Sequence, residues 1–222
     1  MITVARVVEN LVRQSPFISE ALSEGLINVS SLARKLQPEV EKILKKEVKI
    51  GAIGMAVQRL NPGALLFEQR KLVEFFRKVS DLSVRTSLLD YTYRNSETLP
   101  EKQAQLLELI SRRPNVFYTF SQGITETVVI VADWLEADVE RVFQEEKLLY
   151  KEDHLAGITL ILPEDNRQLS GVYYFILKEL AWVGVNLVEV VSTSNEFTII
   201  VQMKDLDQAL GILTGLSKLR GR

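Results

Sequence analysis

The spacing of hydrophobic residues changes near residue 80. Before that point apolar residues recur every three or four positions, which is the spacing of one face of an α-helix. After it they alternate, and Leu82, Val84 and Leu88 fall on one face of an extended strand. The apolar set then moves by one residue to Leu89, so the sequence predicts a β-bulge or bend at Leu88–Leu89.

The first 80 residues predict helices alone. One covers residues 30–36, and Pro38 begins the next, because proline is tolerated in a first helical turn. A third covers residues 49–60 and stops at Asn61-Pro62-Gly63, and a helical pattern resumes over residues 65–79. We therefore expect a helical domain over residues 1–80.

The remainder predicts one order of elements twice: strand, helix, two strands, helix. In residues 81–150 the first strand is followed by a helix over 101–112, strands over 116–120 and 127–131, and a helix after Asp133 and Glu136, which have capping-box spacing. In residues 151–222 the strand is 158–162, the helix 169–183 ends at Gly184, the hairpin strands are 187–193 and 197–202, and Asp205 and Gln208 again have capping-box spacing. Each helix pair must cover one face of a small antiparallel sheet.

The second copy contains two distinctive short stretches. Gly184-Val185-Asn186 follows its first helix, and Ser192-Thr193-Ser194 ends the next strand. An apolar strand at Phe197–Val201 and a helix that begins with acidic residues at Asp205-Leu206-Asp207 follow them in the sequence. Together these features resemble the ACT domain, especially the regulatory ACT pair of aspartokinases. The resemblance implies an α+β chain, in which the helical domain precedes two ferredoxin-like βαββα(β) ACT-type units at 81–150 and 151–222.

The same resemblance implies an amino-acid ligand, held by the loop after the first strand and the start of the second strand. Ser170-Gly171-Val172 stands where the family has pro-gly-val, so the proline is absent. Gly171 would allow close backbone approach, and Asp165 and Asn166 could read an α-amino group. Val185 and Asn186 would present backbone groups, and the Asn186 amide both donates and accepts. The expected ligand-binding set is therefore Asp165, Asn166, Ser170, Gly171, Val185 and Asn186.

Several catalytic classes do not fit this sequence. It has no cysteine and one histidine, His154, which is expected to be an exposed linker residue between the units. An aspartokinase catalytic domain would require far more chain, and Gly51-Ala52-Ile53-Gly54 is too short for a phosphate-binding loop. Trp134 and Trp182 each lie at a predicted helix end, where packing is expected. We expect no cofactor, no metal and no enzymatic activity.

The net charge of −2 conceals an asymmetry along the chain. Residues 1–80 carry 13 Lys and Arg against 8 Asp and Glu, whereas residues 81–222 carry 14 against 21. Residues 27–36 resemble the opening helix of a helix-turn-helix module, with 51–60 as its second helix. Lys42, Lys45, Lys46 and Lys49 would then contact phosphates. The same basic helices could instead serve dimerisation or docking.

The sequence thus predicts a regulatory protein that binds a small ligand, with an amino acid as the favoured class. A DNA-binding regulator with an ACT sensor pair and a ligand-free ACT assembly scaffold stay open as alternatives. Exposed strand edges predict a homodimer, although pairing within one chain would satisfy them as well. No apolar run approaches 18 residues and no secretion signal is recognisable, so no membrane partner and a cytoplasmic location are expected.

Overall fold

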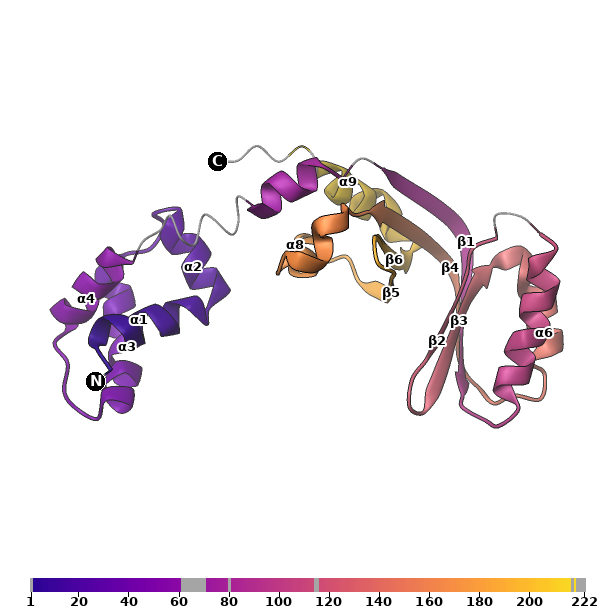
Figure 1. The fold of residues 1–222 in the computed structure, drawn as a ribbon, viewed down its shortest axis with the longest axis horizontal. Helices are drawn as coiled ribbons and strands as arrows, with labels where there is room; N and C mark the ends of the chain where they lie inside the picture. Colours follow the sequence, from indigo (N-terminus) through magenta and orange to yellow (C-terminus); the bar gives the residue numbers. More distant parts are fainter. Residues whose placement is uncertain (1, 61–70, 80, 114–115, 217, 219–222) are drawn as a thin grey trace. The chain divides into compact units, whose positions relative to one another are not determined.

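The computed structural model describes residues 2–60, 71–79, 81–113, 116–216 and 218 (Figure 1). The chain divides into two compact units, Met1–Lys71 and Leu72–Arg222. The first is helical and the second combines one sheet with helices, whereas the sequence predicts three domains at 1–80, 81–150 and 151–222. In the described part of the chain, no helix is both long and apolar enough to cross a membrane.

The helical unit contains α1 (Val4–Arg13), α2 (Pro16–Ser23), α3 (Val29–Leu44) and α4 (Ile50–Arg59). Their apolar stripes meet in one core that includes Val8, Ala33 and Ile53, each fully buried. Side-chain oxygens of Thr3 and Asn28 accept hydrogen bonds from the first-turn amides of α1 and α3, which satisfies donors that a helix leaves unpaired.

The prediction of two helices around Pro38 is wrong, because α3 runs through this residue as a single helix. A proline inside a helix costs about 3 kcal/mol through one lost hydrogen bond and a steric clash. Leu32, Leu36 and Val40 form a buried stripe at intervals of four across this position. Burying each such side chain contributes roughly 1.5–3 kcal/mol, so the continuous stripe outweighs the proline.

The second unit contains a six-stranded sheet in the order β2-β3-β1-β4-β6-β5, with antiparallel neighbours throughout. The strands are β1 (Leu82–Arg94), β2 (Tyr118–Gln122), β3 (Glu126–Ala132), β4 (Leu148–Ile161), β5 (Leu187–Ser192) and β6 (Glu196–Gln202). The helices are α6 (Leu99–Ser111), α7 (Glu136–Val142), α8 (Val172–Trp182) and α9 (Leu206–Leu216). Residues 71–77 form a further helical segment.

Two long strands, β1 and β4, belong to both halves of this sheet (Figure 1). The last part of β1 pairs with β3, and the last part of β4 pairs with β6. Each half is therefore a four-stranded ferredoxin-like unit that borrows an edge from the other. The predicted boundary at 150–151 falls inside β4, and His154 lies in that strand instead of a linker, with an exposed side chain and a φ of 53°.

The predicted irregularity near Leu88–Leu89 is confirmed. The β1–β4 register shifts on both sides of Leu88, and Ser87 has a φ of 60°. After this bulge, Leu89, Tyr91 and Tyr93 face the helices, as the shifted alternation requires.

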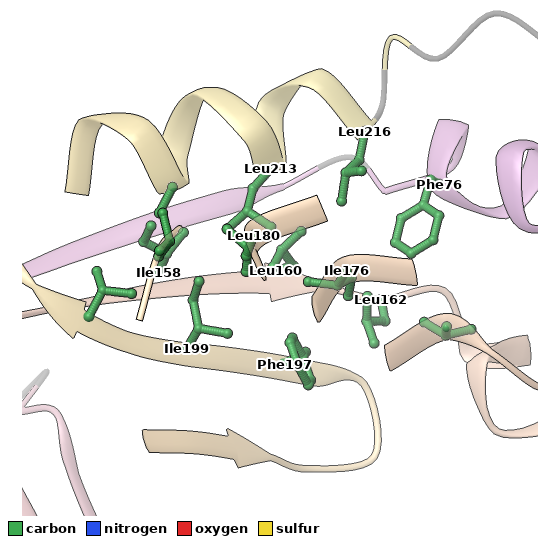
Figure 2. Packing of buried hydrophobic residues seen from close by; sticks show 14 of the residues in the cluster. Phe76, Ile158, Leu160, Leu162, Ile176, Leu180, Phe197, Ile199, Leu213 and Leu216 are labelled. Carbon is green, nitrogen blue, oxygen red and sulfur yellow. The ribbon is translucent and has the colours of Figure 1, made fainter. Parts of the chain in front are cut away.

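Two apolar clusters lie beneath the helices. α6 and α7 cover the one built around Leu89, Tyr91 and Tyr93. α8, α9 and the helical segment 71–77 cover the other, in which Phe76, Ile158 and Ile199 are fully buried (Figure 2). The opposite face of the sheet carries a small cluster of Leu88, Ile130, Leu155 and Ile200. These clusters hold both halves of the sheet as one unit.

The two predicted capping boxes are not formed. A short 3₁₀ turn precedes each helix instead, Asp133–Leu135 before α7 and Met203–Asp205 before α9. The Gln208 amide donates to the Val183 carbonyl in place of a cap. In each case the 3₁₀ turn lies between the end of a strand and the helix, at the position where the capping box is predicted.

Candidate functional site

The loop between β4 and α8 carries four of the six residues expected to bind a ligand. It forms a 3₁₀ turn over Glu164–Gln168, and Asn166 is 8% exposed. The Asn166 Nδ2 group donates to the carbonyls of Pro163, at 2.9 Å, and Ser194, at 2.8 Å. In the first half of the sheet, Asn95 Nδ2 donates to Gly123 in the corresponding hairpin turn, at 2.9 Å. Asn166 thus fastens the loop to the β5–β6 turn.

The other three loop residues are exposed at the start of α8. Asp165 forms a solvent-exposed ion pair with Lys78 at 3.5 Å, and Ser170 precedes the helix. Gly171 is the N-cap residue with a φ of +89°, a conformation that favours glycine. Within the described part of the chain no side chain caps this helix, so its first N–H groups can bind an anion.

Val185 and Asn186 lie beyond the opposite end of α8. Gly184 has the predicted left-handed conformation, and its N–H donates to Ala181 while that of Val185 donates to Leu180. These two bonds form a Schellman motif. Val185 is buried, whereas Asn186 is exposed at the start of β5.

The expected residues therefore form two groups that one chain does not bring together. α8 has 11 residues and separates Gly171 from Asn186. At 1.5 Å per residue this helix is about 16 Å long, which exceeds the length of an amino acid's backbone groups. The group in the β4–α8 loop lies near the end of β5, because Asn166 bonds to Ser194. Asn186 directly precedes the beginning of β5. β5 is an outermost strand of the sheet, so both groups flank the same edge.

The four lysines expected to contact phosphates lie around the α3–α4 connection. Lys42 is in the last turn of α3, Lys45 is its C-cap and Lys49 is the N-cap of α4. All four are exposed, with Glu47 among them. Glu41 accepts a hydrogen bond from the Val48 amide at 2.9 Å, and this contact shapes the connection.

One buried titratable group was missed by the sequence analysis. Asp90 of β1 is 3% exposed, and its Oδ1 atom has no hydrogen-bond partner among the described residues. Burial, together with the nearby carboxylates of Glu189 and Glu152, raises the pKa of Asp90 to about 6. Asp90 lies opposite Glu152 in the β1–β4 register. Neither alternation nor charge pattern marks Asp90 as buried, because it occupies the sheet face that has no helices. No group of three or more potential metal ligands is present in the described ranges.

Both tryptophans differ from the expectation that they pack at helix ends. Trp134 is 52% exposed and Trp182 is 70% exposed. Trp134 lines a cavity of about 380 Å³, together with Leu88 of the cluster on the helix-free face of the sheet. The guanidinium of Arg113 lies 4.8 Å from the centre of the indole ring.

No protein-family profile matches the sequence, and no curated protein matches it. Solved structures do match. A structure of aspartokinase α and β subunits has a TM-score of 0.52 at 15% identity, covering 64% of this chain and 99% of that chain. Aspartate kinase from Clostridium acetobutylicum has a TM-score of 0.53 at 11% identity, and the match covers 62% of this chain and 34% of the kinase chain. The ligand-free regulatory subunit of aspartate kinase from Thermus thermophilus has a TM-score of 0.50 at 10% identity, and the match covers 62% of this chain and 97% of that subunit.

The chain therefore carries an ACT-type fold. The strand order of each half, with two central strands shared between the halves, agrees with the βαββα units expected from the sequence. In this ACT-type pair, the ser-thr-ser stretch at 192–194 forms the end of β5 and its turn. Within this stretch, the Ser194 carbonyl accepts a hydrogen bond from the Asn166 amide and so holds the β4–α8 loop against the turn.

Proposed function

We propose that this protein is a regulator whose ACT-type pair binds a free amino acid at a site formed between two copies of the chain. The observation that carries the proposal is the position of the two expected groups at opposite ends of β5. If two β5 edges pair antiparallel, the start of one strand lies beside the end of the other. Gly171 of one copy then approaches Asn186 of the partner copy, twice in each dimer.

The chemistry of these groups suits a zwitterion. The uncapped first turn of α8 offers N–H groups and the positive end of the helix dipole to a carboxylate. Asp165 offers a carboxylate to an ammonium group, and its present ion pair with Lys78 is exposed and weak. The Asn186 amide can donate and accept at either ligand end.

Regulation, in preference to catalysis, is supported by the matched structures. The Thermus protein is a regulatory subunit, and the match covers 97% of it.

Thermal shift measurements with each of the twenty amino acids test this function. A ligand that binds only the folded protein raises the melting temperature by mass action. We expect one or a few amino acids to do so at millimolar concentration, and Gly171→Val and Asn186→Ala to abolish the shift. If none of the twenty changes the melting temperature, the scaffold alternative replaces the sensor.

A second candidate function is DNA binding by the helical unit under control of the ACT-type pair. Its specific support is the group of exposed lysines at Lys42, Lys45, Lys46 and Lys49 around the α3–α4 connection. Phosphate contacts by these lysines would make affinity fall steeply with salt concentration.

A further inference from the structure

The cavity beside Trp134 lies outside the proposed amino-acid site. It is lined by Arg85, Thr86 and Leu88 of β1, Val116 and Phe117 just before β2, Ala132 at the end of β3, and Trp134 in the 3₁₀ turn that follows β3. Its volume of about 380 Å³ is within the range typical of small-molecule sites. The whole cavity belongs to the first half of the sheet.

The two halves of the sheet differ at this place, and the difference opens the cavity. Leu88 pairs with Ala132, and at the corresponding position Leu155 pairs with Gln202. Arg85 lies three residues before Leu88, as Glu152 does before Leu155. In the second half the Gln202 amide donates to Glu152, so the two side chains contact each other at this place.

In the first half the corresponding side chains leave this space open. Alanine at 132 is too short to reach across, and Arg85 turns toward an aromatic ring, with its guanidinium 5.9 Å from the centre of Phe117. Trp134 stands where the second half has Lys204, two residues after the paired position. The same backbone framework thus carries a filled polar contact in one half and an open aromatic cavity in the other.

The lining defines a ligand class. Phe117 and Trp134 present ring surfaces, and Leu88 and Ala132 provide an apolar floor. Arg85 contributes a guanidinium, whose planar donors match a carboxylate. The indole of Trp134 is held in place by Arg113, which itself pairs with Asp138 at 3.5 Å. A small molecule with a flat apolar ring and one carboxylate could contact all of these groups.

We propose that this cavity binds small aromatic carboxylates, with the ring against Phe117 and Trp134 and the carboxylate on Arg85. This goes beyond the proposed function, because the ligand needs no ammonium group and the cavity needs no second copy of the chain. It makes the ACT-type pair a receptor with two chemically different sites.

The test uses 3-phenylpropionate as probe and the fluorescence of Trp134 as readout. This sequence has two tryptophans, so Trp182→Phe in the otherwise unmodified protein leaves Trp134 as the single reporter. Isothermal titration calorimetry on the unmodified protein gives an independent affinity. We expect saturable binding of 3-phenylpropionate. Its neutral analogue 3-phenylpropanol and the cation phenethylamine should bind at least about tenfold more weakly, because the guanidinium favours an anion.

Two substitutions and a matched control locate the site. Arg85→Gln should weaken binding about tenfold by removing the charged partner. Ala132→Gln should abolish binding by filling the cavity, and glutamine is accommodated at the corresponding position 202. Glu152→Gln, at the place corresponding to Arg85, should leave the affinity unchanged.

Absence of binding by the unmodified protein at millimolar 3-phenylpropionate would overturn the assignment. So would equal affinity in Ala132→Gln, or equal affinity for phenethylamine. Asn186→Ala should bind the probe normally, so failure of the amino-acid site and failure of this cavity give different results.

Discussion

Leu88 and Leu155 face each other across β1 and β4, and exchanging them maps one half of the sheet onto the other. The exchange also maps the pair of Asp90 and Glu152 onto the pair of Gly157 and Arg85. The residue before each leucine, Ser87 and His154, has a positive φ. The two halves are thus related by an approximate two-fold axis at this leucine pair, and both central strands bend there.

The buried carboxyl of Asp90 should make stability depend on pH. Its pKa rises from 3.8 to about 6 in the folded protein, so the folded state binds this proton more tightly than the unfolded chain. Ionisation therefore weakens the fold above about pH 6, and the penalty disappears as the pH falls toward 3.8. At 1.36 kcal/mol per pKa unit the penalty has an upper bound of about 3 kcal/mol.

Asp90→Asn tests this penalty. We expect the variant to be more stable than the parent by about 1–2 kcal/mol at pH 8, and to keep only about a third of this advantage at pH 4.5. Urea unfolding at the two pH values measures the difference. Asp153→Asn is the control, because Asp153 is exposed on the neighbouring strand β4. A pH-independent effect of Asp90→Asn would contradict the account.

The left-handed glycine at the end of α8 gives a second prediction. Gly184→Ala should destabilise the protein by about 1 kcal/mol, since a side chain is strained at a φ of +79°. Gly211→Ala is the matched control: this glycine lies in the exposed interior of α9 with open space around its Cα, so alanine should stabilise by roughly 0.5–1 kcal/mol. Chemical denaturation distinguishes the two signs.

The hydrogen bonds of the Asn166 amide give a third prediction. Asn166→Ala removes the two hydrogen bonds that the largely buried Asn166 amide donates to the carbonyls of Pro163 and Ser194, so we expect a loss of about 1–3 kcal/mol of stability. Asn195→Ala, an exposed neighbour in the adjoining turn, should change stability by less than about 0.5 kcal/mol. Equal effects of the two substitutions on the urea midpoint would show that Asn166 does not fasten the loop.

These examples show what could be predicted from sequence. Gly184 and the hairpins depend on residues adjacent in the chain, so local patterns predicted them. The sharing of β1 and β4 depends on pairing residues that lie about 70 positions apart, which no local pattern encodes. Pro38 was misread because local preference favoured a new helix, whereas packing of the buried stripe decides the structure.

The expected binding residues divide in the same way. Their presence followed from a resemblance in short stretches, but their positions at the two ends of α8 depend on the fold. Asn166 was expected to contact a ligand, and its amide hydrogens are instead taken by two carbonyls. A short polar side chain in a loop looks the same in sequence whether it binds a ligand or the backbone.

The lysines of the helical unit give a fourth prediction. Replacing Lys42, Lys45 and Lys46 by Gln should weaken association with all DNA duplexes alike and reduce its dependence on salt. Folding should change little, because these side chains are exposed. We expect only weak, non-specific association, since residues 81–222 are acidic. Sequence-selective binding at physiological salt, measured by fluorescence anisotropy, would favour the DNA-binding alternative.

If Gly171 of one copy and Asn186 of another complete one amino-acid site, two inactive variants should restore binding when they are mixed. Gly171→Val and Asn186→Ala should each fail to bind the amino acid that raises the melting temperature of the unmodified protein. A mixed dimer keeps one intact site, made from the Gly171 of one variant and the Asn186 of the other. Calorimetry on an equal mixture, after subunit exchange, should therefore recover about one site in four. Binding that stays absent after exchange, or a protein that sediments as a 25.2 kDa monomer with ligand bound, would contradict the account.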